Sequence, residues 1–194
     1  MAFARPKKRE PVGEAGLFDY AVAALARRMR TVRDLRRLMR TRAEEGETGE
    51  RAMDAVCIRL KELGYLSDTR FAADYTRLRK ENEKFGRRRV QQDLMQKGVE
   101  KELISTTLAT AYDEVDEVAL ARQYVARKRM KKPSGIHAQK ETARVMGRLM
   151  RAGFSSNSIY KVLREWDLPE EAMPVEGGAD SDSYAERDED LPDF

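Results

Sequence analysis

The chain has 194 residues, of which 41% are hydrophobic and 37% are charged, and its formal net charge is +4. Runs of 18 apolar residues are absent, which argues against a transmembrane helix, and the charge density favours several small cores over one large core. Strong helix formers dominate and β-branched runs are absent, so the composition predicts an all-α fold. The single cysteine, Cys57, excludes an internal disulfide framework and a zinc site built on several thiolates.

The N-terminal segment, residues 1–16, opens with the basic sequence MAFARPKKRE. It lacks the apolar stretch of a secretory signal, so we expect a flexible basic segment and a cytoplasmic protein.

A first unit of three helices is predicted for residues 17–66. Apolar residues recur at helical spacing at Phe18, Ala21 and Leu25, and the sequence DLRRLMRTRA follows at 34–43. The apolar face of the third helix comprises Met53, Val56, Cys57, Leu60 and Leu63. We therefore expect Cys57 to be a buried, neutral thiol.

Two further units, residues 67–115 and 116–168, repeat this design. DLRRLMRTRA, RVQQDLMQKG (89–98) and RVMGRLMRAG (144–153) place equivalent apolar residues 55 positions apart. In the last two segments Gly98 and Gly153 stand where a helix should stop, because glycine adopts the left-handed conformation at little cost. The sequence thus predicts nine helices in three tandem three-helix repeats that form an elongated, curved array.

The joint between the first two units is the sequence LGYLSDTRFAADY, residues 63–75. We expect Gly64 to end one helix and Ser67 or Asp68 to cap the next. Tyr65 and Leu66 are expected to pack across the joint.

Charge is divided unevenly along the chain. Residues 169–194 contain ten acidic residues and one basic residue, which leaves +13 for residues 1–168. We expect an acidic, disordered tail that either aids solubility or competes for the basic body. Basic clusters recur where one predicted helix ends and the next begins. Each cluster taken alone could bind a partner or could simply be a solvated surface.

Several segments also carry a family resemblance. LGYLSDTRFAADY resembles the LGYLDDxRFAxxY signature of the RecX family, bacterial regulatory proteins that modulate the recombinase RecA. FGRRRVQQDLMQKGVEKELI (85–104) is similar to its G-x-R-R-I-x-x-E-L-x-x-K-G-I segment, TVRDLRRLMRTR (31–42) to its S-x-x-E-L-x-x-K-L motif, and LMRAGFSSNSIYKVL (149–163) to its closing repeat. Ser67 replaces the first aspartate of the signature, and Ala43 stands where the family usually has glycine.

The resemblance implies a non-enzymatic regulator that lies in the helical groove of the RecA filament on single-stranded DNA. Such a protein bridges protomers, depresses ATP hydrolysis and strand exchange, and thereby restrains recombination and repair. We expect a monomer without cofactor or metal that contacts the RecA filament and binds single- or double-stranded DNA weakly, without sequence preference. The candidate contact residues are basic: Arg36, Arg37, Arg77, Arg79, Arg87, Arg88, Arg89, Lys97, Arg127, Lys128 and Arg129.

Two other functions are compatible with part of this sequence pattern. A stand-alone, sequence-independent DNA-binding repeat protein would use the same positive charge, but no arginine-flanked aromatic platform is evident. An enzyme is disfavoured because the nucleotide-binding, zinc-protease and calcium-loop motifs are absent and the one histidine, His137, lies in a loop sequence.

Overall fold

The computed structural model describes residues 10–168, which fold into nine α-helices, one π-helical turn and one 3-10 turn, without a strand. The predicted all-α fold is confirmed. The acidic tail at 169–194 and most of the expected flexible N-terminal segment lie outside the described residues.

The first unit comprises α1 (Glu14–Arg27), α2 (Val32–Met39) and α3 (Glu47–Glu62). Its core contains Leu17, Leu35, Met39, Met53 and Leu60, each at most 1% exposed. Cys57 is buried beside them, as predicted, whereas Leu63 is half exposed and is no core residue. Helix α1 begins at Glu14, so the unit boundary expected at residue 17 falls inside a helix.

The second unit comprises α4 (Asp68–Leu78), α5 (Arg87–Gln96) and α6 (Lys101–Tyr112). A π-helical turn, η1 (Arg79–Glu83), extends α4 and was not foreseen. Phe71, Val90, Leu94, Ile104 and Leu108 form the core.

The third unit comprises α7 (Glu117–Arg127), α8 (Ala138–Arg151) and α9 (Ser156–Arg164), with the 3-10 turn η2 (Gly135–His137) before α8. Its core gathers Leu120, Tyr124, Leu149, Phe154, Ile159 and Leu163. Phe85 and Tyr112 border both this core and the second one, so the two units share an apolar boundary.

Polar caps and glycines set where several helices begin and end. The side chains of Thr31, Ser67, Asp116 and Ser155 accept hydrogen bonds from backbone N–H groups in the first turns of α2, α4, α7 and α9. Gly98 and Gly153 end α5 and α8 with φ of +75° and +91°, which confirms the two predicted stops.

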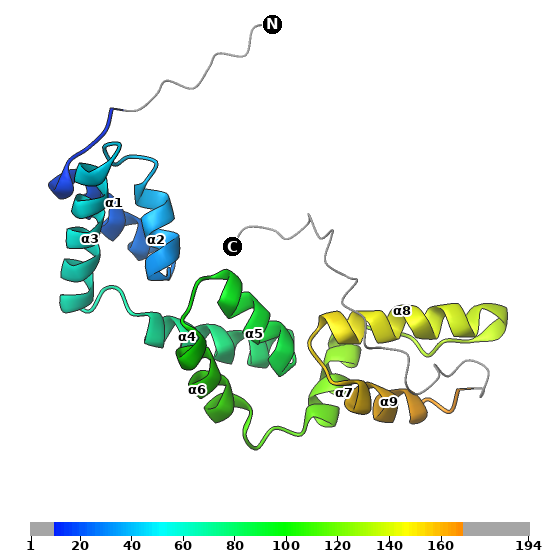
Figure 1. Ribbon diagram of the computed structural model, residues 1–194. Coiled ribbons are helices and arrows are strands. Elements are labelled where there is room, and N and C mark those ends of the chain that lie inside the picture. The colour runs from blue at the N-terminus through cyan, green and yellow to red at the C-terminus, as the bar shows by residue number, and fades with distance from the viewer. Residues whose placement is uncertain (1–9, 169–194) are drawn as a thin grey trace, which may run out of the picture.

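The three units follow one another along an arc (Figure 1). The middle helix of each unit, α2, α5 or α8, lies on the inner side toward which the arc bends, while the first and third helices form the outer side. This arrangement matches the predicted elongated, curved array.

The joint between the first two units differs in detail from the expectation. Leu66 is 2% exposed and completes the first core, but Tyr65 is 61% exposed and does not pack across the joint. Ser67 alone caps α4, accepting from the Arg70 amide at 3.2 Å. The Asp68 carboxylate instead accepts from the Val32 amide of the first unit at 2.9 Å.

Candidate partner-binding surface

The middle helices meet end to end, and both junctions use equivalent positions. The Thr31 hydroxyl donates to the Lys97 carbonyl at 2.7 Å, which joins the start of α2 to the end of α5. The Gly86 amide donates to the Ala152 carbonyl at 2.8 Å, which joins the start of α5 to the end of α8. Residues 31 and 86, like 97 and 152, are 55 positions apart, so the repeat seen in sequence is also a repeat of the contact.

Glycine is required at the second junction because two backbones touch there. A Cβ on Gly153 would lie 2.7 Å from the Cβ of Arg89 and overlap the Arg89 backbone nitrogen. A Cβ on Gly86 would lie 2.6 Å from the carbonyl carbon of Gly153. These contacts fix the angle between the second and third units and hence the curvature of the inner surface.

In the first unit, the candidate arginines on α2 differ in their partners. Arg36 pairs with Glu50 at 2.6 Å and with Asp54, both on α3. Arg37 is exposed and forms no ion pair with another described residue. Arg37 is therefore the more available of the two for an external anion.

In the second unit, two candidates are held by a shared buried aspartate. Asp93 is 8% exposed and lies 3.0 Å from the Arg89 Nε and 3.9 Å from the Arg79 Nε. The Arg79 guanidinium also lies over the rings of Tyr75 and Phe85, 4.9 Å and 5.9 Å from their centroids. Arg79 and Arg89 are therefore engaged within the unit and do not project to a partner.

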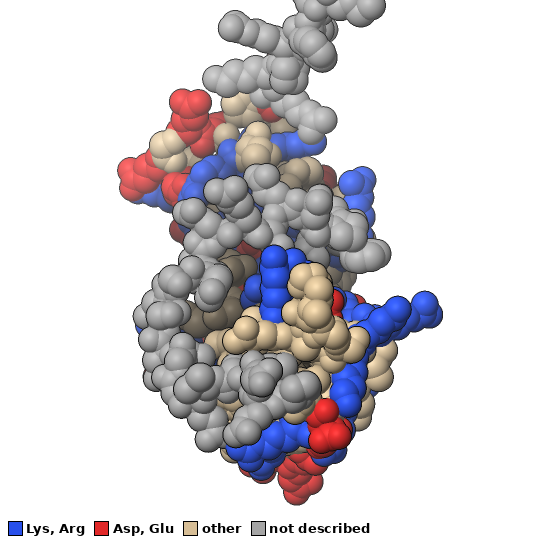
Figure 2. All heavy atoms as spheres, turned by 90° about the vertical axis from the view of Figure 1, so that its right-hand side faces the viewer, with Lys and Arg blue, Asp and Glu red and all other residues tan. Residues whose placement is uncertain are grey.

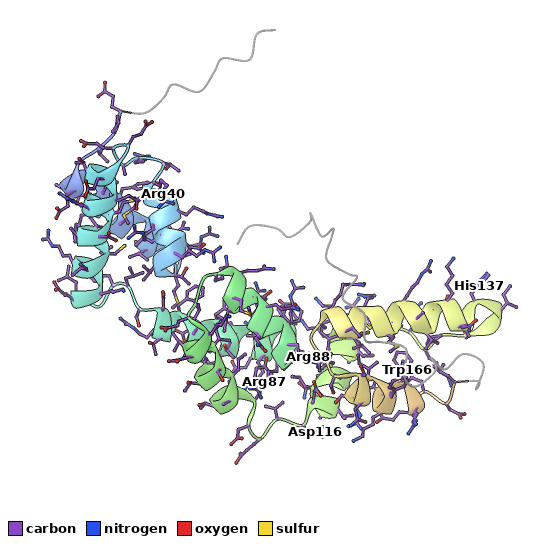
Figure 3. All side chains as sticks on the ribbon, viewed as in Figure 1. Arg40, Arg87, Arg88, Asp116, His137 and Trp166 are labelled. Atoms are coloured by element: carbon purple, nitrogen blue, oxygen red, sulfur yellow. The ribbon has the colours of Figure 1, made fainter. Side chains whose placement is uncertain are left out.

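Arg87 and Arg88, by contrast, are exposed at the start of α5, beside the third unit (Figure 3). Arg87 forms no ion pair with another described residue. The Arg88 amide donates to the Gly153 carbonyl, and its charge contributes to lowering the pKa of Glu117 on α7. Both guanidinium groups remain accessible to a partner at the second junction.

The remaining candidates lie in separate places. Lys97 lies at the first one, where its Nζ is 3.5 Å from Asp34. Arg127 and Lys128 both pair with Glu83 at 3.4 Å, which ties α7 to η1. Arg129 is exposed, with φ of +49°.

Arg77 pairs along its own helix with Asp74 and Glu81, at 3.4 Å and 3.5 Å, on an exposed face. The structure thus does not gather all eleven candidates into one patch.

The candidates predicted from the sequence leave out further basic residues on or beside the inner helices. Lys140, Arg144, Arg148 and Arg151 are exposed along α8, and Arg33, Arg40 and Lys61 border the first junction. The spacing of three or four residues along α8 is a signal that could have been read, because it places these side chains on one helix face.

The charged side chains also show an uneven distribution over the surface. Seen from the third-unit end, long basic side chains project on the right, whereas acidic side chains gather at the upper left and at the bottom (Figure 2). Among the described residues no group of three His, Cys, Asp or Glu side chains could hold a metal ion. No described helix is long and apolar enough to span a bilayer.

Fold and surface together define a class: a basic helical-repeat protein whose middle helices form an inner row that carries exposed arginines and lysines. A family model for the second three-helix domain of RecX matches residues 67–108, which correspond to α4, α5 and most of α6. The chain is 30% identical over 147 residues to Regulatory protein RecX of Trichlorobacter lovleyi, covering 76% of this chain and 86% of that one. It belongs to the RecX family of regulatory proteins.

Other relatives agree with this assignment. Regulatory protein RecX of Streptomyces coelicolor is 32% identical over 127 residues, or 66% of each chain, so the match spans just under two thirds of that relative. The protein of the same name from Mycobacterium ulcerans is 29% identical over 163 residues, 84% of this chain and 91% of that one. The crystal structure of RecX from Lactobacillus salivarius has the same fold, with a TM-score of 0.59 and 18% identity over 79% of this chain and 96% of that one.

Proposed function

We propose that this chain binds the RecA filament on DNA, along the helical groove, and inhibits its ATP hydrolysis and recombination activity. The observation that carries the proposal is the inner row of α2, α5 and α8, which is curved, joined at both junctions, and carries exposed arginines on each helix. A curved array can follow a helical groove over several protomers, and exposed arginines suit the carboxylates and phosphates of a nucleoprotein. The family supplies RecA as the target.

On this proposal the chain acts as a non-catalytic cytoplasmic monomer. Its free energy of binding comes from shape and charge, with arginines supplying most of the polar contacts. A nucleoprotein groove provides more surface of matching shape and more anionic groups than naked DNA does, so the filament is the preferred partner.

The test is inhibition of RecA ATP hydrolysis on single-stranded DNA by the chain and by Arg87→Glu/Arg88→Glu. We expect the wild type to inhibit and the variant to lose inhibition, because reversed charges repel an anionic groove. The control is Lys101→Glu/Lys161→Glu, which makes the same charge change at exposed positions on the outer helices α6 and α9. Equal loss in both variants would mean that only net charge matters, and no inhibition by the wild type would refute the proposal.

The alternative, a stand-alone DNA-binding protein, is favoured only by the positive charge. Titration of single-stranded DNA with and without RecA at rising salt separates the two. We expect RecA to raise the apparent affinity, and a chain that binds naked DNA equally well would support the alternative.

A further inference from the structure

The first junction contains a cationic pocket of about 460 Å³ between α2, the end of α3 and the second unit. Arg33, Arg36, Arg37, Arg40 and Lys61 supply five cations to its lining, and Asp68 is the one acid there. The Asp68 carboxylate already accepts the Val32 amide, so part of its hydrogen-bonding capacity is used. The pocket therefore concentrates positive charge in a concave place.

Four of the five cations fall into two kinds, and the fifth, Arg33, lies against Gly98. Glu50 holds Arg36 and Arg40, at 2.6 Å and 2.9 Å, and orients them from α3. Arg37 and Lys61 are exposed and form no ion pair with another described residue. An anion site benefits from both kinds of cation. The arginines that Glu50 orients need no reordering when an anion binds, and Arg37 and Lys61 have no competing partner.

The second junction offers an internal comparison. Positions 55 residues after Arg33, Arg36, Arg37 and Arg40 hold Arg88, Gln91, Gln92 and Met95, so three of the four arginines are replaced by neutral residues. The two junctions nevertheless meet at equivalent positions: the Gly86 amide and the Ala152 carbonyl stand where the first junction has the Thr31 hydroxyl and the Lys97 carbonyl. Contact between units therefore does not require arginine at the places of Arg36, Arg37 and Arg40.

We propose that the first-junction pocket binds the phosphodiester backbone of single-stranded DNA, and that the second junction does not. This inference rests on the proposed function and deepens it, because it assigns the DNA contact to one end of the inner row. Guanidinium groups match phosphate oxygens with two parallel hydrogen bonds, and several of them in one pocket can follow successive phosphates. The second junction keeps the exposed Arg87 and Arg88, which the proposed function assigns to RecA, but Gln91, Gln92 and Met95 take the places of Arg36, Arg37 and Arg40.

The test measures binding of the full chain to a fluorescent oligothymidine by anisotropy over a range of salt. Each lost phosphate contact on a single strand should reduce the slope of log K against log salt by about 0.7. Arg37→Gln/Lys61→Gln should therefore flatten the slope by about 1.4 and weaken binding on the order of tenfold near 0.15 M salt. The matched control, Lys101→Gln/Lys161→Gln, removes two charges outside the pocket and should change the slope little.

A swap that keeps the net charge constant separates the effect of the arginine's position from the effect of net charge. Arg37→Gln/Gln92→Arg moves the arginine to the equivalent place in the second junction, and it should bind as weakly as Arg37→Gln alone. Wild-type affinity in the swap, or equal slopes in the pocket and control variants, would overturn the inference. Both exchanged positions are exposed, and far-UV circular dichroism with urea unfolding checks that every variant is folded.

The two experiments distinguish a pocket that does not bind DNA from a chain that does not regulate RecA. If the pocket variants bind DNA normally but lose RecA inhibition, the pocket inference is wrong and the regulatory function stands. If the wild type does not inhibit RecA while the pocket variants lose DNA binding, the pocket inference stands and the proposed function is wrong.

Discussion

The carboxylate of Asp68, at the start of α4, accepts a hydrogen bond of 2.9 Å from the amide of Val32, at the start of α2. An acidic side chain from one unit thus caps a helix of the preceding unit. The neighbouring Thr31 hydroxyl is fully buried and donates to the Lys97 carbonyl at 2.7 Å. These two bonds make the first junction a defined contact rather than a loose linker.

Asp68→Ala should loosen this junction, because the Val32 amide loses its acceptor. We expect a cost of about 1 kcal/mol and increased solvent exchange at the Val32 amide. Asp68→Asn keeps an oxygen acceptor and should restore most of the protection. Hydrogen exchange measured by NMR tests this, and unchanged Val32 exchange in the alanine variant would contradict it.

Gly153→Ala should be far more disruptive than the same change at Gly64. Both glycines follow a helix with positive φ, so each substitution carries a backbone cost of about 1–2 kcal/mol. Only at Gly153 does the new Cβ also overlap the Arg89 backbone, whereas at Gly64 it meets only the Arg70 side chain at 3.6 Å. Small-angle scattering should show a changed shape for Gly153→Ala alone, and equal profiles would refute the packing argument.

Leu94→Asp should unfold the middle unit. Leu94 is fully buried in the second core, so the substitution buries an unpaired charge and should cost more than about 4 kcal/mol. Met95→Asp is the adjacent control, since Met95 is 46% exposed and should change stability by less than about 1 kcal/mol. Urea unfolding followed by circular dichroism compares them, and similar midpoints would show that the core assignment is wrong.

Glu117 should make the third unit sensitive to acid. Burial raises its carboxyl pKa, but hydrogen bonds from Ser155 and Ser158 outweigh burial and hold the pKa below its ordinary value. Because the pKa is lower in the folded chain, the carboxylate stabilises the fold at pH values above the unfolded pKa of about 4.3. This stabilisation is lost as the pH falls through the pKa of the folded chain.

Glu117→Gln should therefore lower the urea midpoint at pH 7, and its difference from the wild type should shrink below about pH 4. Trp166 is the one tryptophan of the chain and packs against the third core, so its fluorescence reports on this unit. A constant difference across this pH range would rule out the carboxylate as the cause.

Truncation after Leu168 should strengthen binding to single-stranded DNA at low salt. It raises the formal net charge from +4 to +13, and the added attraction should fade toward 1 M salt, where the Debye length is about 3 Å. Oligonucleotide titrations of both chains test this. A tail that serves solubility alone would leave DNA affinity unchanged and make the truncated chain precipitate at lower concentration.

The fold class, the three units and most of the core follow from local patterns in the sequence. Periodic apolar residues and the glycines at 98 and 153 are local signals, and each acts through the helix that contains it. The 55-residue interval between equivalent apolar residues also indicates that the units share one structure, because repeated packing requires repeated side chains. Tyr65 was misplaced because an aromatic residue in a short linker can point either way.

Which charged side chains are available depends on contacts between helices that are distant in sequence. Arg87 and Arg89 look alike in sequence, yet Arg89 faces the buried Asp93 and Arg87 faces solvent. Asp68 looked like a cap for its own helix and instead binds Val32, 36 residues earlier. Partners brought together from distant parts of the chain leave no periodic mark, since an ion pair or pocket depends on how whole helices are placed in space.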